Sequence, residues 1–293
     1  MLEPTSANGS GEAGRRDDDD HTSRDEARSL RASANGGGAP RALIEDEHPP
    51  GVDGTAPAGR SILPVQRLGA ALEVLLCSGF PTQILLIAVL TGAGMRMHEE
   101  PGHLSPLFVF TVSLLDTAFV LALISFFVHA HRESPQEMFV GRRRVGREAV
   151  LGLVLVPVLF MIVFAILALV MAFAPRLHNV ARNPFEDLMQ TPSDVLAFGV
   201  VVMVAGGLRE EVQRAFVLRR FEQYLGGGVT GVVVFSAAFG LGHVEQGLDA
   251  ALATAVLGAS WGVIYLIRRS IVAPMVSHAA FNLAQLLKYV TLA

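Results

Sequence analysis

The sequence of 293 residues contains one cysteine and one tryptophan, and charged side chains make up only 17% of it. A single cysteine, Cys77, excludes an intramolecular disulfide and a cysteine-rich metal site, and its apolar neighbours favour a packing role. There is no basic patch interleaved with aromatic residues, so the sequence predicts no nucleic-acid partner. Hydrophobic residues reach 51% and the mean hydropathy is +0.46, which is typical of a membrane protein.

The N-terminal segment differs from this apolar composition. Residues 1–60 are rich in Gly, Ala, Ser, Pro and charged side chains, and they include the acidic run Asp17 to Asp20. Such a segment buries too little apolar surface to offset the entropy that it would lose on ordering. We therefore expect a disordered, acidic cytoplasmic tail at 1–60 and a helical transmembrane domain at 61–293.

Apolar stretches follow, and most of them approach the length of about 20 residues that crosses a bilayer. They are residues 68–94, 107–128, 150–174, 195–220, 229–243, 248–267 and 271–292. Glu73 and Pro81 interrupt the first stretch, and Pro157 predicts a kink in the third. The predicted fold class is all-α, a polytopic helical membrane protein with seven, or eight, transmembrane helices.

The arginines predict an orientation. The loop between the second and third stretches carries five of them: Arg132, Arg142, Arg143, Arg144 and Arg147. An excess of Lys and Arg marks cytoplasmic loops. Alternation then places Arg219–Arg220 and Arg268–Arg269 on the same side, the N-terminus in the cytoplasm, and residues 96–105 and 175–194 outside. In a bacterium this would be a multi-pass protein of the plasma membrane.

Two adjacent carboxylates, Glu210 and Glu211, lie within the fourth stretch. A charged side chain at the bilayer centre costs about 2.5–3.5 kcal/mol on insertion scales, so it is expected to be paired or to face a water-filled cavity. Arg214 follows at i+4 and i+3 from the two glutamates and can pair with either of them on a helix. The sequence therefore predicts a polar site inside the membrane domain.

Two later stretches carry further polar groups that belong to such a site. His243 ends the motif Phe239-Gly-Leu-Gly-His, while His278 and Asn282 are spaced i, i+4 and project from one helical face. At about 1.5 Å of rise per residue, Glu210 lies roughly 15 Å deep, His278 roughly 10 Å, Asn282 roughly 16 Å and His243 roughly 20 Å. These depths fall around the middle of a hydrocarbon core about 30 Å thick, which allows one shared site.

The succession of Glu-Glu followed by Arg, Phe-x-x-x-His and His-x-x-x-Asn on membrane helices resembles the CPBP family of intramembrane proteases. That family includes CAAX proteases and bacteriocin-processing enzymes, and the resemblance covers residues 195–292. It implies that Glu210 and His243 hold and deprotonate a water molecule, while His278 and Asn282 donate hydrogen bonds to the oxyanion. A carboxylate base and preorganised donors are suited to peptide hydrolysis, and no covalent nucleophile is required.

The arginine spacing departs from the family pattern. The family usually reads Glu-Glu-x-x-x-Arg, whereas Arg214 lies one residue earlier and Ala215 occupies the expected position. We expect Glu210 to be the base, with Glu211 as the alternative. Arg214 is expected to orient and neutralise the second carboxylate, and Phe239 to support the site.

A metal centre is a second option for the same residues. Glu210, His243 and His278 could hold a zinc ion with an open position for water. The sequence has no His-Glu-x-x-His helix, and the family resemblance implies a glutamate and histidine mechanism that needs no metal. Trp261 and Tyr289 are expected to be packing or interfacial residues.

The leading hypothesis is an intramembrane endopeptidase of the glutamic type. It would cleave near a membrane-anchored terminus of a protein or peptide, lipidated or not, within the lipid bilayer. One alternative is a non-catalytic membrane scaffold or immunity-type protein of the same fold. Another is a proton-coupled transporter that uses Asp116, Glu210 and the histidines, although no internal repeat supports it.

Overall fold

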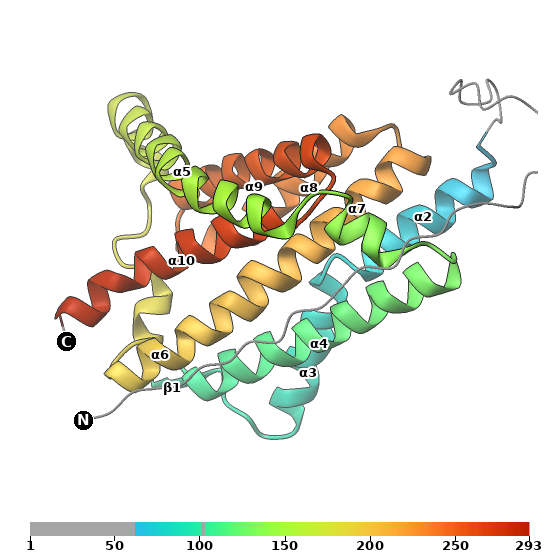
Figure 1. Cartoon of the computed structure of the whole chain (residues 1–293). Helices are drawn as coiled ribbons and strands as arrows, with labels where there is room; N and C mark the ends of the chain where they lie inside the picture. Colours follow the sequence, from blue (N-terminus) through green and yellow to red (C-terminus); the bar gives the residue numbers. More distant parts are fainter. Residues whose placement is uncertain (1–61, 101–102, 293) are drawn as a thin grey trace, which may run out of the picture. The chain divides into compact units, whose positions relative to one another are not determined.

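A computed structural model describes residues 62–100 and 103–292, and the predicted disordered tail at 1–60 lies outside these ranges. The described chain is mainly helical, which confirms the all-α prediction (Figure 1). Its α-helices are α2 (Pro64–Leu76), α3 (Phe80–Gly92), α4 (Pro106–Ala130), α5 (Val145–Phe173), α6 (Pro192–Val201), α7 (Glu210–Tyr224), α8 (Gly228–Leu241), α9 (Leu248–Arg268) and α10 (Val272–Leu292). The described residues also include two π-helices, η1 (Gln136–Val140) and η4 (Val202–Arg209), and three 3-10 helices, η2 (Pro175–Leu177), η3 (Pro184–Leu188) and η5 (Val244–Gln246).

The first predicted span is broken into α2 and α3, which meet at an angle of 43°. Gly79 at the break has φ +85°, a left-handed conformation that glycine adopts without steric cost. Gln213 donates from Nε2 to the carbonyl oxygen of Cys77 at 2.6 Å, so a backbone acceptor freed by the break is satisfied. Glu73 does not cause the interruption; it lies within α2 and accepts a hydrogen bond from Arg220 Nε at 2.5 Å.

A short hairpin precedes α4. Its strands, β1 (His98–Glu100) and β2 (His103–Leu104), pair antiparallel with an irregular register, His98 opposite Leu104 and Glu100 opposite His103. Ser105 then caps α4 by accepting from the amide of Phe108. The hairpin contacts the segment between α5 and α6, because β2 packs against η3 and His103 Nδ1 lies 3.2 Å from Asp187 Oδ1.

The central element is the continuous helical stretch formed by α6, η4 and α7 (Figure 1). It begins with a capping box between Thr191 and Asp194, which donate to each other's side chains from the backbone. η4 packs against α10 and α4, while α7 packs against α2, α4 and α8. The helix that carries both glutamates is thus surrounded by protein on several sides.

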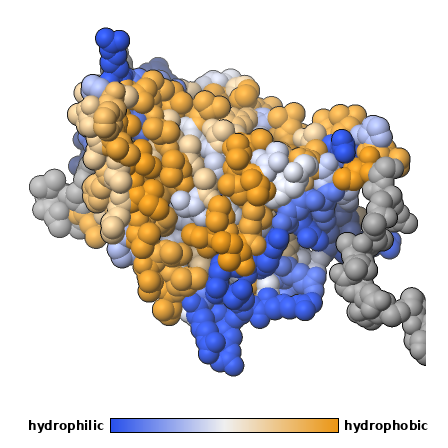
Figure 2. Space-filling view, turned by 90° about the horizontal axis from the view of Figure 1, so that it is seen from above, coloured by the Kyte–Doolittle hydropathy of each residue, from blue (hydrophilic) through white to orange (hydrophobic). Residues whose placement is uncertain are grey.

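Three described helices, α4, α5 and α9, are long and apolar enough to cross a bilayer, and the bent pair α2–α3 adds a fourth. The predicted count of seven is not reached by these criteria, because α8 has only 14 residues and α7 carries several charges. On α5, Met161 is 70% exposed and Phe173 is 83% exposed, as expected for side chains that face lipid. Figure 2 shows a broad hydrophobic surface bounded by a group of hydrophilic residues. The chain is an integral membrane protein of the all-α class.

Candidate active site

One cavity of about 960 Å³ collects the predicted catalytic residues. Four of them line it, from α7, from the turn after α8 and from α10: Glu210, His243, His278 and Asn282. Phe239 on α8 lines the cavity as well. Glu211 and Arg214 lie beneath this surface, and each is only 1% exposed. The structure therefore separates the predicted residues into a group that faces the cavity and a buried pair behind it.

The π-helix η4 brings the central helix close to α10. A Cβ on Gly206 would come within 2.8 Å of Asn282 Nδ2, and a Cβ on Gly207 within 2.9 Å of Ala279 Cβ. Glycine is therefore required at both positions for the two helices to approach this closely. π-helical segments inside helices occur frequently at functional sites, and here the segment ends directly before Glu210.

The two adjacent glutamates have different surroundings. The Glu210 side chain is 18% exposed, and its Oε2 lies 3.7 Å from Nε2 of His278. Glu211 Oε1 accepts a hydrogen bond from His278 Nδ1 at 2.8 Å and pairs with Nη1 of Arg214. Glu210 is thus the carboxylate available to the cavity, whereas Glu211 is already occupied by two partners.

Arg214 sits in an aromatic pocket beneath the site. Its guanidinium carbon lies 5.2 Å from the ring centres of Phe235 and Phe239 and 5.4 Å from that of Trp261. Aromatic faces attract a buried guanidinium, and Glu211 compensates its charge. Breaking a buried ion pair of this kind is strongly destabilising. The shortened arginine spacing still allows this contact, since i+3 and i+4 positions share a helical face.

The ring of His278 is held by an aromatic stack. Trp261 stacks on it with ring centres 3.8 Å apart and an interplanar angle of 18°. The indole Nε1 of Trp261 donates to Ser277 Oγ at 3.0 Å, and Ser277 donates to the carbonyl oxygen of Pro274 at 2.9 Å. Trp261 is therefore a support of the site and not an interfacial anchor, and no sequence spacing relates it to His278.

The contact with Glu211 fixes which nitrogen of His278 carries a proton. A carboxylate only accepts, so Nδ1 is the donor in the 2.8 Å bond. In the neutral ring, Nε2 then carries a lone pair and can accept a hydrogen bond beside Glu210. Nε2 can donate to an oxyanion only when the ring is the imidazolium, so the predicted oxyanion role requires His278 in its charged form.

His243 follows α8 and is oriented by the last turn of that helix. Its Nδ1 donates to the carbonyl oxygen of Phe239 at 2.8 Å, which leaves Nε2 unprotonated in the neutral ring. Phe239 meets the His243 ring edge-on at 4.9 Å between centres and the His278 ring edge-on at 6.2 Å. A basic nitrogen is thereby held at the cavity, in the tautomer that a proton acceptor needs.

A charged pair that sequence reasoning did not connect lines the same cavity. Arg209 Nη2 donates to Asp116 Oδ2 at 2.5 Å, and both side chains are nearly buried. Asp116 is the acid on which the transporter alternative depends, and here it is neutralised by an arginine. The sequence shows Arg209 next to Glu210, which marks it as a candidate residue of the site. Asp116 lies 93 residues away, so no local pattern relates it to Arg209.

The described side chains do not form a ready metal centre. No group of three or more His, Cys, Asp or Glu residues among those described is arranged to hold a metal ion. For the zinc alternative, Nδ1 of His278 is engaged with Glu211, and only its Nε2 lies near Glu210, at 3.7 Å. Glu210 and His278 therefore offer two donors at this point, and His243 is not grouped with them among the described side chains.

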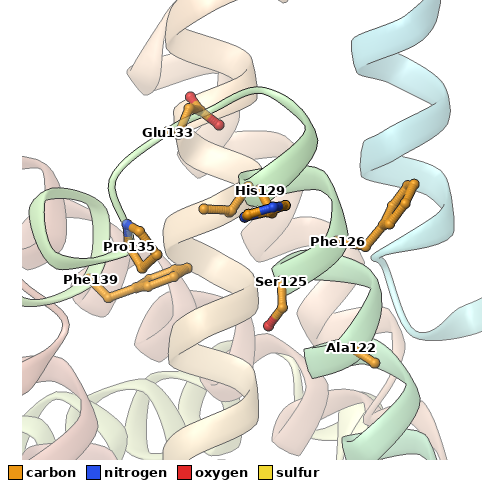
Figure 3. Close-up of a pocket in the computed structure, with 8 residues that line it drawn as sticks. Ala122, Ser125, Phe126, His129, Glu133, Pro135 and Phe139 are labelled. Carbon is orange, nitrogen blue, oxygen red and sulfur yellow. The ribbon is translucent and has the colours of Figure 1, made fainter.

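A separate cavity of about 710 Å³ lies at the C-terminal end of α4 and contains none of the predicted site residues. Figure 3 shows Ser125, His129, Glu133 and Phe139 around it. Glu133 accepts hydrogen bonds from Arg220 at 2.7 Å and from Gln223 at 2.9 Å, so its carboxylate serves an ion-pair network. The catalytic candidates thus belong to the larger cavity alone.

The comparison with protein families agrees with the geometry. Residues 192–284 match the Rce1-like family of type II CAAX prenyl endopeptidases. The matched segment runs from α6 to the first part of α10, and it confirms the predicted family resemblance for about one third of the chain. No curated protein and no solved structure gives a significant match. The Rce1-like family indicates a protease that acts on membrane-anchored proteins.

Proposed function

We propose that this chain is an intramembrane endopeptidase of the glutamic type, with Glu210 as the general base. The observation that carries the proposal is the separation of the two glutamates. Glu210 faces the cavity 3.7 Å from His278, whereas Glu211 is committed to Arg214 and His278. A base needs a carboxylate that can reach a water molecule, and Glu210 meets this requirement.

In the proposed reaction, Glu210 and His243 hold a water molecule in the cavity. Glu210 accepts one proton as the water oxygen bonds to the carbonyl carbon of the substrate peptide. Asn282 and the imidazolium of His278 donate to the resulting oxyanion, and such donors are worth about 2.7–4 kcal/mol each. Collapse of this intermediate breaks the carbon–nitrogen bond, and Glu210 returns the proton to the departing amine.

Glu211 and Arg214 act through His278 in this scheme. Glu211 holds Nδ1 at 2.8 Å, so the opposite nitrogen, Nε2, is directed toward Glu210 and the cavity. Arg214 keeps Glu211 charged and in place, and Trp261 stacks on the ring. These three are positioning residues, since none of them is required to touch the substrate.

The substrate is proposed to be a membrane-anchored protein or peptide, lipidated or not, that is cleaved near its anchored terminus. The cavity lies among helices whose outer surfaces are apolar, which suits a segment that arrives through the bilayer. A volume of about 960 Å³ lies within the range of pockets that enclose a ligand of several hundred daltons. A short stretch of extended peptide is of this size.

We further propose that the cavity opens on the extracytoplasmic side. Its lining includes Leu104 from the hairpin, His178 and Phe185 from the segment between α5 and α6, and Gln246 from η5. These segments lie at the helix ends opposite the arginine-rich loop 131–144. If the arginines mark the cytoplasm, as in other membrane proteins, the substrate enters from the other face.

Comparative mass spectrometry of membrane-protein termini tests this function. Cells that express the wild-type protein should contain new termini that are absent from cells expressing Glu210→Gln, His243→Ala or His278→Ala at equal membrane levels. Identical termini in the wild-type and Glu210→Gln cells would remove the assignment of Glu210 as the base. Such a result would favour the scaffold alternative, in which the fold is kept without chemistry.

A further inference from the structure

The loop between α4 and α5 lies at an end of the membrane domain where positive charge is in excess. Four acidic residues at this end are already paired, and their partners are arginines of α7 and of the turn between α9 and α10. The pairs are Glu73 and Glu133 with Arg220, Glu148 with Arg268, and Glu222 with Arg269. These carboxylates therefore do not compensate the arginines of the loop itself.

Four arginines lie at the start of α5, and all of them are exposed: Arg142, Arg143, Arg144 and Arg147. Arg142 lies 3.7 Å from Glu137, but this contact is weak because both side chains are largely exposed to solvent. In the described part of the chain, Arg144 and Arg147 form no ion pair and no side-chain hydrogen bond. Their guanidinium groups are available to an anion from outside the protein.

The segment that carries these arginines is fixed to the turn between α9 and α10. The carbonyl oxygen of Phe139 accepts a hydrogen bond from the amide of Ile271 at 2.8 Å. Arg143 donates from Nε to the carbonyl oxygen of Arg268 at 3.0 Å. Gly141, with φ +70°, lies so close to the same turn that a Cβ would collide with its backbone. Because this backbone is already fixed, binding an anion here loses little entropy from ordering of the loop.

Beyond Arg147, α5 presents an apolar stripe on its outer surface. Four exposed residues share a helical face with Arg147, since they follow it at i+3, i+7, i+11 and i+14: Val150, Val154, Val158 and Met161. At 1.5 Å of rise per residue, the stripe extends about 21 Å from Arg147. It therefore covers the depth of one leaflet, which is half of a hydrocarbon core about 30 Å thick.

We propose that Arg142, Arg144 and Arg147 bind the phosphate of an anionic phospholipid whose acyl chain lies along the stripe of α5. This assignment does not depend on the proposed endopeptidase function. The guanidinium fork matches the geometry of phosphate oxygens, and a phospholipid joins a phosphate to an acyl chain in the order that this surface requires. An anionic headgroup is favoured over phosphatidylcholine, whose own cationic group is repelled by the arginines. Each basic residue near an anionic membrane surface contributes about 5-fold to binding, about 1 kcal/mol.

Energy transfer from Trp261 to a pyrene-labelled acyl chain measures the binding. Trp261 is the single tryptophan, and it belongs to α9, the helix that ends at Arg268. The full-length protein in a nonionic detergent is titrated with pyrene-labelled phosphatidylglycerol and, separately, with pyrene-labelled phosphatidylcholine. The wild-type protein should prefer phosphatidylglycerol by about 100-fold, which is about 5-fold for each of three arginines. Arg144→Gln combined with Arg147→Gln should reduce this preference to about 5-fold and leave the affinity for phosphatidylcholine unchanged.

The matched control removes the same charge elsewhere. Arg96→Gln combined with Arg176→Gln should keep the full preference, since both arginines are exposed and Arg176 follows the other end of α5. Equal wild-type affinity for the two lipids would overturn the proposal, and so would the same preference in both double variants. Displacement of the labelled lipid by inorganic phosphate alone would assign the arginines to free phosphate. A preference that emerges only after Asp17 to Asp20 are all replaced by Asn would assign them to that acidic run, and either result would overturn the lipid site.

Discussion

The two glutamates should respond in opposite ways to the same substitution. Glu211→Gln removes the charge that compensates Arg214, and both side chains are 1% exposed. Removing one member of a buried ion pair costs about 3–5 kcal/mol, and solvent screening does not reduce this value at such burial. For a domain of 150–250 residues, that loss corresponds to a fall of roughly 6–20 °C in Tm.

Glu210→Gln should leave stability nearly unchanged. The side chain is 18% exposed, and its nearest charged partner is His278 Nε2 at 3.7 Å, beyond hydrogen-bond distance. A substitution of this kind is expected to shift the free energy of unfolding by no more than about 0.5 kcal/mol. Catalysis should fall by about 10²- to 10⁴-fold, the usual contribution of a general base.

Intrinsic fluorescence can follow unfolding at the site itself. The chain has a single tryptophan, and Trp261 stacks on His278. Thermal scans of both variants in detergent should therefore show a large shift for Glu211→Gln and almost none for Glu210→Gln. Peptide cleavage is measured on the same samples at a temperature where both are folded. The reasoning fails if Glu210→Gln is the unstable variant, or if Glu211→Gln is as stable as the wild type.

Three further outcomes are expected. Gly206→Ala places a Cβ 2.8 Å from Nδ2 of Asn282 and should lower kcat by about 10²- to 10³-fold, whereas Gly146→Ala, with open space around its Cβ, should not; equal activity of the two would remove the close-packing argument. Chelators should leave cleavage unchanged, and reactivation of a chelated sample by zinc alone would support the metal alternative. A membrane-impermeant thiol reagent added to intact cells should label Ala181→Cys, in the segment predicted to lie outside, and not Arg142→Cys, in the loop predicted to lie inside. The native Cys77 is buried and should give little background, and the reverse labelling pattern would invert the predicted topology.

The sequence could predict that the candidate residues lie around one cavity, because they are polar residues in apolar surroundings. Glu210, His243 and the His278/Asn282 pair are polar groups within apolar stretches, and polar groups inside a membrane are expected to converge. Their order along the chain then indicated the family that residues 192–284 match. The helical class followed from the same apolar stretches.

The remaining features depend on tertiary contacts that no local pattern encodes. Trp261 is 17 residues from His278 in sequence, and its stacking arises from how α9 packs beside α10. Asp116 and Arg209 meet across α4 and η4. Hydropathy also does not separate full crossings from shorter helices, because α8 has 14 residues and at 1.5 Å each reaches only about 21 Å.

The π-helix η4 also determines how the site would respond to a change in chain length. An ordinary α-helix turns about 100° per residue, so deleting Gly206 would let the helix relax to regular geometry while rotating everything after it against α6. Glu210 would then leave the cavity even though every proposed catalytic residue is still present. The irregular turn therefore fixes the rotation of α7 about the helix axis relative to α6. A more regular and more stable helix at this position would give a less active protein.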